Sequence, residues 1–280
     1  MTSVIQTSSH FVSSPRGDQR IHVHVTGAGD APPVLLLHSG GFTTRQWRRL
    51  TELLAPSYRV IAPDLLGYAE STRIADKEPF HFRQDLALLE ILLAEIGTPA
   101  HLVGHSYGGL LALKLALAQP SRVRSMALYE PVAFGVLGEN LEADVNRELG
   151  RISLAPNGEG TVDDAWLSMF VDWWNGVGAW KAMAAETKAA FRSVGWKVFQ
   201  EVCSLVDDHT PLATYATIEA PTLLLGGDQS PAVEQNVLAR LAGAMPHARH
   251  DVLAGVGHMG PITHGAQVNK AIADFIAARD

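Results

Sequence analysis

The chain has 280 residues, of which 47% are hydrophobic and 18% are charged, and these values are typical of an ordinary globular protein. Lysines and arginines number 22 against 29 acidic residues, so the net charge is −7, and there is no basic stripe. This charge pattern argues against nucleic acid or an anionic membrane surface as a partner. Cys203 is the only cysteine, which excludes an intrachain disulfide, and the N-terminus lacks a signal-peptide pattern, so we expect a cytoplasmic location.

The first half of the chain alternates between strand and helix patterns. Short apolar or alternating runs predict strands at residues 20–26, 34–37, 58–62, 101–103 and 123–129. Helical spacing predicts helices at residues 47–54, 82–96 and 110–119. No stretch is apolar enough over a sufficient length to span a bilayer, because the most apolar one, 110–118, is short and contains a lysine. The alternation predicts an α/β fold with a mostly parallel sheet covered on both faces.

Residues 132–211 interrupt this alternation with helical segments and loops. Five of the six tryptophans lie there: Trp166, Trp173, Trp174, Trp180 and Trp196. Large aromatic side chains can form the core of a small helical unit, or several can line an apolar pocket. The alternation resumes with strands at 221–225 and 249–253 and helices at 232–244 and 266–278. We therefore expect a core made of residues 1–131 and 212–280, with residues 132–211 inserted into it.

The motif Gly104-His105-Ser106-Tyr107-Gly108 stands between a predicted strand and a predicted helix. A serine on such a sharp turn presents its hydroxyl away from the backbone, and the flanking glycines allow close approach of neighbouring chain. The motif in this context predicts that Ser106 is a nucleophile.

Several reactive side chains follow directly after predicted strands, where groups gather at the carboxyl edge of a parallel sheet. They are His38, Asp64, Ser106, Glu130, Asp228 and His258. A serine needs a base to remove its proton and an acid to orient that base. His258 lies in the glycine-rich loop 255–260 and is the best candidate for the base, whereas His105 is expected to point away from the serine.

The order of Ser106, an acid and His258, together with the turn His38-Ser39-Gly40-Gly41, resembles the α/β-hydrolase superfamily over nearly the whole chain. The resemblance implies an α/β-hydrolase fold in which residues 132–211 form a helical cap over the active site. It also implies an oxyanion hole made of the backbone N–H groups of Tyr107 and Gly40. Because Ser39 replaces the usual glycine of the turn, the choice between Gly40 and Gly41 stays open.

Two carboxylates compete for the third position of the triad. The family's usual acid follows the strand at 221–225, but here Gln229 occupies the expected position and Asp228 comes one residue early. A minority of the superfamily carries the acid after the strand that follows the nucleophile helix, where this chain has Glu130. An unpaired buried carboxylate is costly, so a glutamate at the end of a buried strand requires a partner. We favour Glu130, with Asp228 as the alternative.

These residues predict a serine hydrolase that cleaves an ester, a thioester or a lactone of a small, largely apolar substrate through an acyl-enzyme. One alternative is a carbon–carbon bond hydrolase of a dicarbonyl compound, and another is a ligand-binding member of the fold without activity. No cofactor is implied, and no histidine or cysteine spacing suggests a metal. The expected partner is a small-molecule substrate, and the sequence leaves the oligomeric state open.

Overall fold

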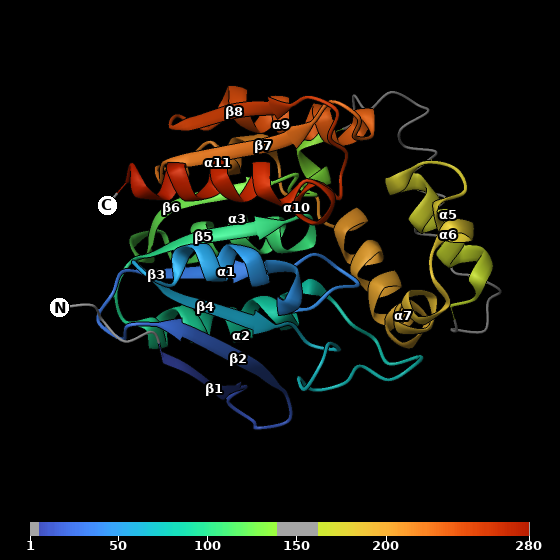
Figure 1. The fold of residues 1–280 in the computed structure, drawn as a ribbon, viewed down its shortest axis with the longest axis horizontal. Helices are drawn as coiled ribbons and strands as arrows, with labels where there is room; N and C mark the ends of the chain where they lie inside the picture. The colour runs from blue at the N-terminus through green and yellow to red at the C-terminus, as the bar shows by residue number, and fades with distance from the viewer. Residues whose placement is uncertain (1–5, 139–161, 280) are drawn as a thin grey trace.

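An eight-stranded sheet forms the centre of the molecule (Figure 1). The computed structural model describes residues 6–138 and 162–279. Its strands are β1 (Gln6–Ser13), β2 (Arg20–Gly27), β3 (Pro33–Leu37), β4 (Arg59–Asp64), β5 (Ala100–His105), β6 (Val123–Tyr129), β7 (Thr222–Gly227) and β8 (Ala248–Leu253). They lie in the order β1-β2-β4-β3-β5-β6-β7-β8, and among them β2 alone runs in the direction opposite to the other seven.

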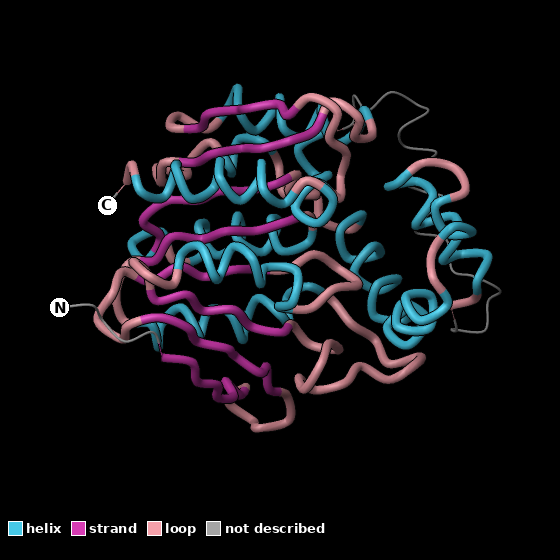
Figure 2. Tube along the Cα trace, viewed as in Figure 1, coloured by secondary structure: helices cyan, strands magenta, loops and turns pink. Residues whose placement is uncertain are grey.

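Helices cover both faces of the sheet (Figures 1 and 2). One face carries α1 (Arg48–Leu54) and α11 (Gly265–Ala277), and the other carries α2 (Phe82–Ile96), α3 (Tyr107–Ala118) and α9 (Ala232–Ala244). Short helical turns connect the larger elements: η1 (Thr44–Trp47), η2 (Pro120–Arg122), η3 (Phe134–Leu137), α8 (Leu212–Tyr215) and α10 (Gly260–Thr263). The predicted fold class, a doubly covered and mostly parallel sheet, is confirmed.

Strand β3, at the centre of the sheet, is apolar throughout because it supplies two cores. Leu35 and Leu37 of β3 belong to the core beneath α2, α3 and α9, whereas Val34 and Leu36 belong to the core beneath α1 and α11. Side chains alternate between the faces of a strand, so a strand covered on both sides needs apolar residues at every position. This double burial explains why short continuous apolar runs predicted the central strands.

The sequence reasoning missed β1 at the edge of the sheet. Only Val12 of this strand is buried, and its other side chains are exposed. Backbone pairing with β2 holds this strand in place. Because its side chains are largely exposed, its sequence shows no periodic pattern of apolar residues. The edge position therefore explains the miss.

Three helices lie beyond the carboxyl ends of the strands, at the right of Figure 1, and we call them the cap helices. They are α5 (Asp164–Asn175), α6 (Ala179–Ala182) and α7 (Ala185–Val206). In the described part of 132–211 there is no strand, as expected. Residues 139–161 lie outside the described residues, so the exact boundaries of the insertion stay a prediction.

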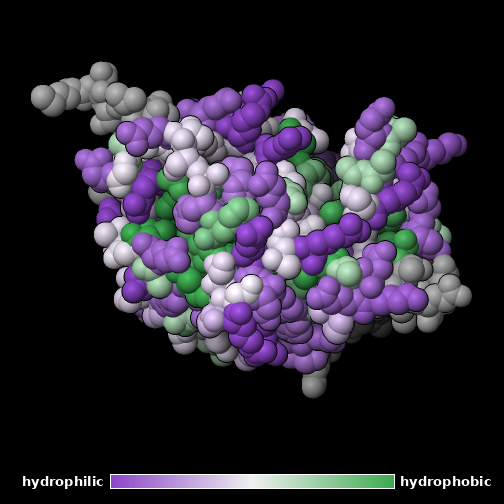
Figure 3. Space-filling view, turned by 90° about the horizontal axis from the view of Figure 1, so that it is seen from below, coloured by the Kyte–Doolittle hydropathy of each residue, from purple (hydrophilic) through white to green (hydrophobic). Residues whose placement is uncertain are grey.

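Seen from below, the molecule presents polar side chains over most of its surface, and apolar ones lie in hollows between them (Figure 3). None of the described helices combines the length and the hydropathy that crossing a membrane would require.

Candidate active site

Ser106 lies on a strained turn between β5 and α3. Its φ of +53° and ψ of −117° are unfavourable for a residue with a side chain, and strain of this kind typically persists at functional sites. The two flanking glycines are required because a side chain at either position would clash with neighbouring backbone atoms. A Cβ on Gly104 would lie 2.5 Å from the carbonyl oxygen of Gly108, and a Cβ on Gly108 would lie 2.3 Å from that of Leu37. Backbone packing thus enforces both glycines of the motif.

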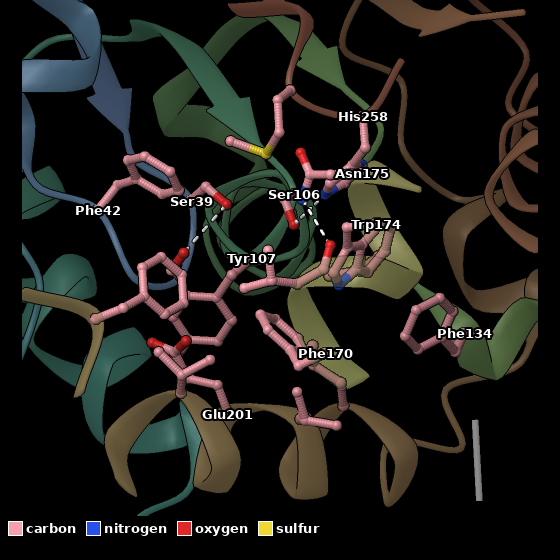
Figure 4. Close-up of a pocket in the computed structure, with 18 of the residues that line it drawn as sticks. Ser39, Phe42, Ser106, Tyr107, Phe134, Phe170, Trp174, Asn175, Glu201 and His258 are labelled. Carbon is pink, nitrogen blue, oxygen red and sulfur yellow. Dashed lines mark hydrogen bonds between the residues drawn. The ribbon is translucent and has the colours of Figure 1, made fainter. Parts of the chain in front are cut away.

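A continuous hydrogen-bonded chain links Ser106 to His258 and Glu130. The His258 Nε2 atom lies 3.0 Å from Ser106 Oγ, and its Nδ1 atom lies 2.7 Å from Glu130 Oε2. All three residues are buried, with exposed fractions of 7% for Ser106, 3% for His258 and 0% for Glu130. Figure 4 shows Ser106 and His258 joined at one side of a cavity. The structure therefore brings these three predicted residues together.

Glu130 is held from two sides. It follows β6 with a φ of +46°, and its second oxygen, Oε1, accepts hydrogen bonds from the Gly227 N–H at 2.7 Å and the Ser230 hydroxyl at 2.6 Å. A buried carboxylate is tolerable when hydrogen bonds and a partner compensate for the lost water. These bonds leave Oε2 directed at His258.

Asp228, the alternative acid, occupies a different place. Its carboxylate is exposed, and Oδ1 accepts a hydrogen bond from the Gly255 N–H at 2.7 Å. No hydrogen bond joins it to His258 among those of the described residues. Asp228 thus stabilises the turn that leads into the His258 loop.

The His258 loop is fastened by two residues that sequence reasoning did not assign. His105 Nε2 donates to the His258 carbonyl oxygen at 2.9 Å, and the Tyr129 hydroxyl donates to the Gly257 carbonyl oxygen at 2.8 Å. Burial lowers the pKa of His105 well below its ordinary value, which keeps the ring neutral. His105 makes no hydrogen bond to Ser106 among those of the described residues, in keeping with the expectation that it points away, but it holds the backbone of His258, the candidate base.

Trp174 of α5 stacks on the imidazole of His258, with ring centroids 3.7 Å apart and planes inclined by 22°. A cap helix therefore contacts His258, the candidate base at the sheet edge. The sequence indicated an aromatic-rich segment but not which ring would take this position.

The turn after β3 leaves one backbone N–H available. The Ser39 N–H donates to Gln46 Oε1 at 3.1 Å, and the Gly41 N–H donates to the Tyr68 hydroxyl at 2.8 Å. Among the hydrogen bonds of the described residues, none uses the Gly40 N–H. This arrangement favours Gly40 over Gly41 for the oxyanion hole.

His38 stiffens the same turn from behind. Its Nε2 atom accepts the Leu65 N–H at 3.0 Å, so Nδ1 carries the proton and donates to the Ser39 carbonyl oxygen at 2.8 Å. Burial lowers the pKa of His38, which preserves this neutral, doubly bonded ring.

A cavity of about 100 Å³ opens above Ser106 (Figure 4). A cavity that holds a single water has a volume of about 10–15 Å³, so this larger space suits a small organic group. Its wall is largely apolar and is supplied mainly by α5, α7 and the segment after β6. The apolar lining residues include Phe134, Phe170, Val171, Trp174, Met183, Phe191, Val198, Val202 and Leu205. Phe170, Trp174 and Phe191 line the cavity, so several large aromatic side chains of the segment do so, as expected, although Trp174 is the only one of its five tryptophans among the described lining residues.

The packing of the cap helices explains where the other aromatic side chains go. Trp166 stacks on Phe170 with ring centroids 5.1 Å apart and meets Phe199 edge-on. Trp166 is buried, and it therefore contributes to the internal core of the cap rather than to the cavity wall.

A buried polar cluster under the cavity has no counterpart in the sequence reasoning. Lys197 Nζ lies 2.6 Å from Glu201 Oε1 and 3.0 Å from Asp85 Oδ2, and the Tyr107 hydroxyl donates to Asp85 at 2.8 Å. Tyr68 donates to Glu201 at 3.0 Å. Burial raises the pKa of Glu201 to about 7, against the opposing effect of Lys197. The available signal was a lysine and a glutamate four residues apart on an otherwise apolar helix face.

One cluster of metal-type side chains lies outside this site. The ligand atoms of His22, His24 and Asp64 are within 4.8 Å of one another. Hydrogen bonds explain the position of Asp64 without a metal. Its two oxygens accept from the Thr44 N–H at 2.8 Å and from His24 Nε2 at 3.1 Å. Asp64 thereby ties β2 to the start of η1, which suits the structural role expected for it, and the absence of a metal site stays a prediction.

Known proteins resemble this chain over almost its entire length. A 2-hydroxy-6-oxononadienedioate/2-hydroxy-6-oxononatrienedioate hydrolase of Paraburkholderia xenovorans is 27% identical over 285 residues, which cover 97% of this chain and 96% of that protein. A pimeloyl-acyl-carrier protein methyl ester esterase of Xanthomonas campestris is 29% identical over 264 residues, covering 91% of this chain and 99% of that protein.

Solved structures support the same fold. The crystal structure of a hydrolase from Pseudomonas aeruginosa covers 96% of this chain and 98% of its own, with a TM-score of 0.75 and 21% sequence identity. The sequence profile of the alpha/beta hydrolase family matches residues 34–271. A match of that extent, on a fold of this topology, identifies the chain as a hydrolase of the alpha/beta hydrolase family.

Proposed function

We propose that the protein is a serine hydrolase that cleaves an ester, a thioester or a lactone through an acyl-enzyme. The observation that carries this proposal is the unbroken chain from Ser106 Oγ to His258 at 3.0 Å and on to Glu130 at 2.7 Å. Such a chain activates a hydroxyl that is otherwise a poor nucleophile.

In the proposed mechanism, Ser106 Oγ attacks the substrate carbonyl carbon while His258 takes its proton. Glu130 orients the imidazole and stabilises the imidazolium that forms. The negative oxygen of the tetrahedral intermediate is bound by the Gly40 and Tyr107 N–H groups. His258 then gives its proton to the leaving group, and water activated by His258 releases the acid from Ser106.

The cavity supports a small, largely apolar substrate. Its volume of about 100 Å³ and its wall of aromatic and aliphatic side chains suit an acyl group of modest size. A polymer or a folded protein would not reach Ser106 through such a space, so a small molecule is the proposed substrate.

Carbon–carbon bond cleavage is the second candidate, because a relative at 27% identity is named as a hydrolase of a dioate, a compound with two carboxylates. Buried carboxylates need a charge partner. No lysine or arginine lines the cavity among the described residues, and Glu201 places an acid there instead. This charge pattern favours an uncharged ester over a dicarboxylate.

A fluorophosphonate probe tests the proposal directly. We expect a covalent adduct on Ser106 in the wild-type protein and none in Ser106→Ala, detected by mass spectrometry of the labelled peptide. Absence of the adduct in the folded wild-type protein would instead support the ligand-binding alternative.

Turnover of a panel then separates the bond classes. The panel contains p-nitrophenyl esters, a thioester, a lactone and a vinylogous dicarbonyl acid. We expect hydrolysis of at least one of the first three and none of the dicarbonyl acid; the reverse pattern would establish the carbon–carbon hydrolase.

A further inference from the structure

Glu201 is the only carboxylate among the described residues that line the cavity. It is 2% exposed, and its two oxygens have different surroundings. Oε1 accepts from Lys197 at 2.6 Å and from the Tyr68 hydroxyl at 3.0 Å, whereas no hydrogen bond of the described residues involves Oε2. Oε2 is not among the fully buried oxygens without a partner, so it faces the cavity, where a bound molecule can reach it.

The free oxygen lies beside the proposed oxyanion hole. A Cβ built on Gly40 would lie 2.3 Å from Glu201 Oε2, so the carboxylate occupies the space that a side chain at position 40 would need. In Figure 4 Glu201 rises from α7 with its carboxylate end away from the helix. A substrate whose carbonyl oxygen binds the Gly40 N–H would therefore bring its neighbouring carbons close to Oε2.

Lys197 accounts for one oxygen of Glu201 only. Its ammonium group is shared between Glu201 and Asp85, so one cation serves two carboxylates. The other donors of the cluster are also committed, because the Tyr107 hydroxyl bonds Asp85 and the Tyr68 hydroxyl bonds Oε1. The cavity side of the cluster is therefore left with an unsatisfied acceptor and an excess of negative charge.

We propose that Glu201 Oε2 recognises a hydrogen-bond donor, a hydroxyl or ammonium group, carried by the substrate within a few bonds of the scissile carbonyl. The same oxygen repels substrates that carry a carboxylate at that place. Glu201 is then a specificity-determining residue of the hydrolase proposed above, and the inference rests on that function. A charge-assisted hydrogen bond in a buried site is strong enough to set such a preference.

The test compares three esters with four-carbon acyl groups: p-nitrophenyl butyrate, p-nitrophenyl 3-hydroxybutyrate, which carries a hydroxyl on the third carbon, and mono-p-nitrophenyl succinate, whose fourth carbon is a carboxylate. Assays are run at pH 8, because the Glu201 pKa of about 7 leaves the carboxyl mostly ionised there. In the wild-type protein we expect the hydroxy ester to exceed the butyrate by about tenfold in kcat/KM, and the succinate to fall well below it.

The variant Glu201→Gln removes the charge and keeps the size of the side chain. We expect the preference for the hydroxy ester to shrink to about threefold or less, and the succinate to gain about tenfold relative to the butyrate. Glu186→Gln is the matched control, since Glu186 lies on the same helix with an exposed side chain. Its substrate ratios should equal those of the wild-type protein.

Should Glu201→Gln fold poorly, Glu201→Leu provides a second variant, which keeps Lys197 paired with Asp85 and so leaves neither of these two charges alone. If either folded variant loses the wild-type ratios of kcat/KM between the three esters, the proposal is supported. If both variants keep these ratios, the role of Glu201 is overturned, but the proposed hydrolase function is not. Failure of the wild-type protein to label at Ser106 would instead overturn the proposed function.

Discussion

The carboxyl edge of the sheet and the cap helices contribute to one site in different ways. At the sheet edge, Ser106 and Glu130 are positioned by the backbone, since both follow strands and both have positive φ values. The cap helices contribute side chains, among them Trp174 and Glu201, that reach toward this edge from α5 and α7.

This difference suggests a division of labour. Backbone geometry set by a hydrogen-bonded sheet holds reacting groups with little freedom, as catalysis requires. Side chains on a separate layer can change in size or charge without moving that geometry. We therefore expect substitutions at the sheet edge to affect all substrates alike. Substitutions in the cap helices should change which substrate is preferred, except at Trp174, which contacts His258.

The largest expected effect concerns Glu130, the proposed triad acid at the sheet edge. Glu130→Gln should lower kcat by about 10³- to 10⁴-fold on every ester, because the amide no longer stabilises the imidazolium. Asp228→Asn is the matched control at the alternative position and should stay within about threefold of the wild-type kcat. A collapse of turnover in Asp228→Asn alone would make Asp228 the acid.

The next effect concerns the ion pair that joins the cap helix α7 to the core helix α2. Lys197 of α7 binds Asp85 of α2, so Lys197→Met leaves two buried carboxylates without their cation and should lower the free energy of unfolding by about 3–5 kcal/mol.

The double variant Lys197→Met with Glu201→Leu should recover part of this loss, because it removes one of the two charges. Urea denaturation of the single and double variants measures the difference. Equal destabilisation of both would mean that the loss comes from Asp85 and not from the charge of Glu201.

A smaller effect is expected at Glu234 of α9, within the core. Both of its carboxyl oxygens are buried and have no hydrogen-bond partner among the described residues, and burial together with Glu130 raises its pKa well above the ordinary value. Between pH 4.5 and the raised pKa, the unfolded chain loses this proton and the folded protein keeps it, so stability falls as the pH rises.

Glu234→Met should therefore stabilise the fold by about 1–3 kcal/mol at pH 8 and by less at pH 5. Urea denaturation at the two pH values provides the measurement. A gain independent of pH would exclude titration of Glu234 as its cause.

The smallest effect concerns Trp174, the cap residue that contacts the triad. If its ring stabilises the imidazolium of His258, Trp174→Leu should lower kcat by about fivefold on all three test esters equally. A change in substrate preference without a uniform loss of kcat would show that Trp174 determines specificity, as we propose for Glu201, and does not assist His258. Phe170→Leu, at a lining position one turn away, is the matched control for lost volume.

The parts of the fold and site that were predictable carry local signals. Continuous apolar runs predicted the central strands, and glycines on either side of Ser106 marked its turn. The strand β1 carried no such signal, because backbone pairing holds it while its side chains face water. The fastening of the His258 loop by His105 and Tyr129 was not predictable, because it joins residues more than a hundred positions apart.

By itself, the sequence determined the order of strands and helices, the reactive turn at Ser106 and the two acids that compete to pair with His258. These features depend on side-chain periodicity and on glycine, which act over a few residues. Only the tertiary structure decided that Glu130 faces His258, that the Gly40 N–H is left free and that Glu201 enters the cavity. Each of these depends on distances between segments remote in the chain, and such distances are set by how the sheet edge and the cap helices pack together.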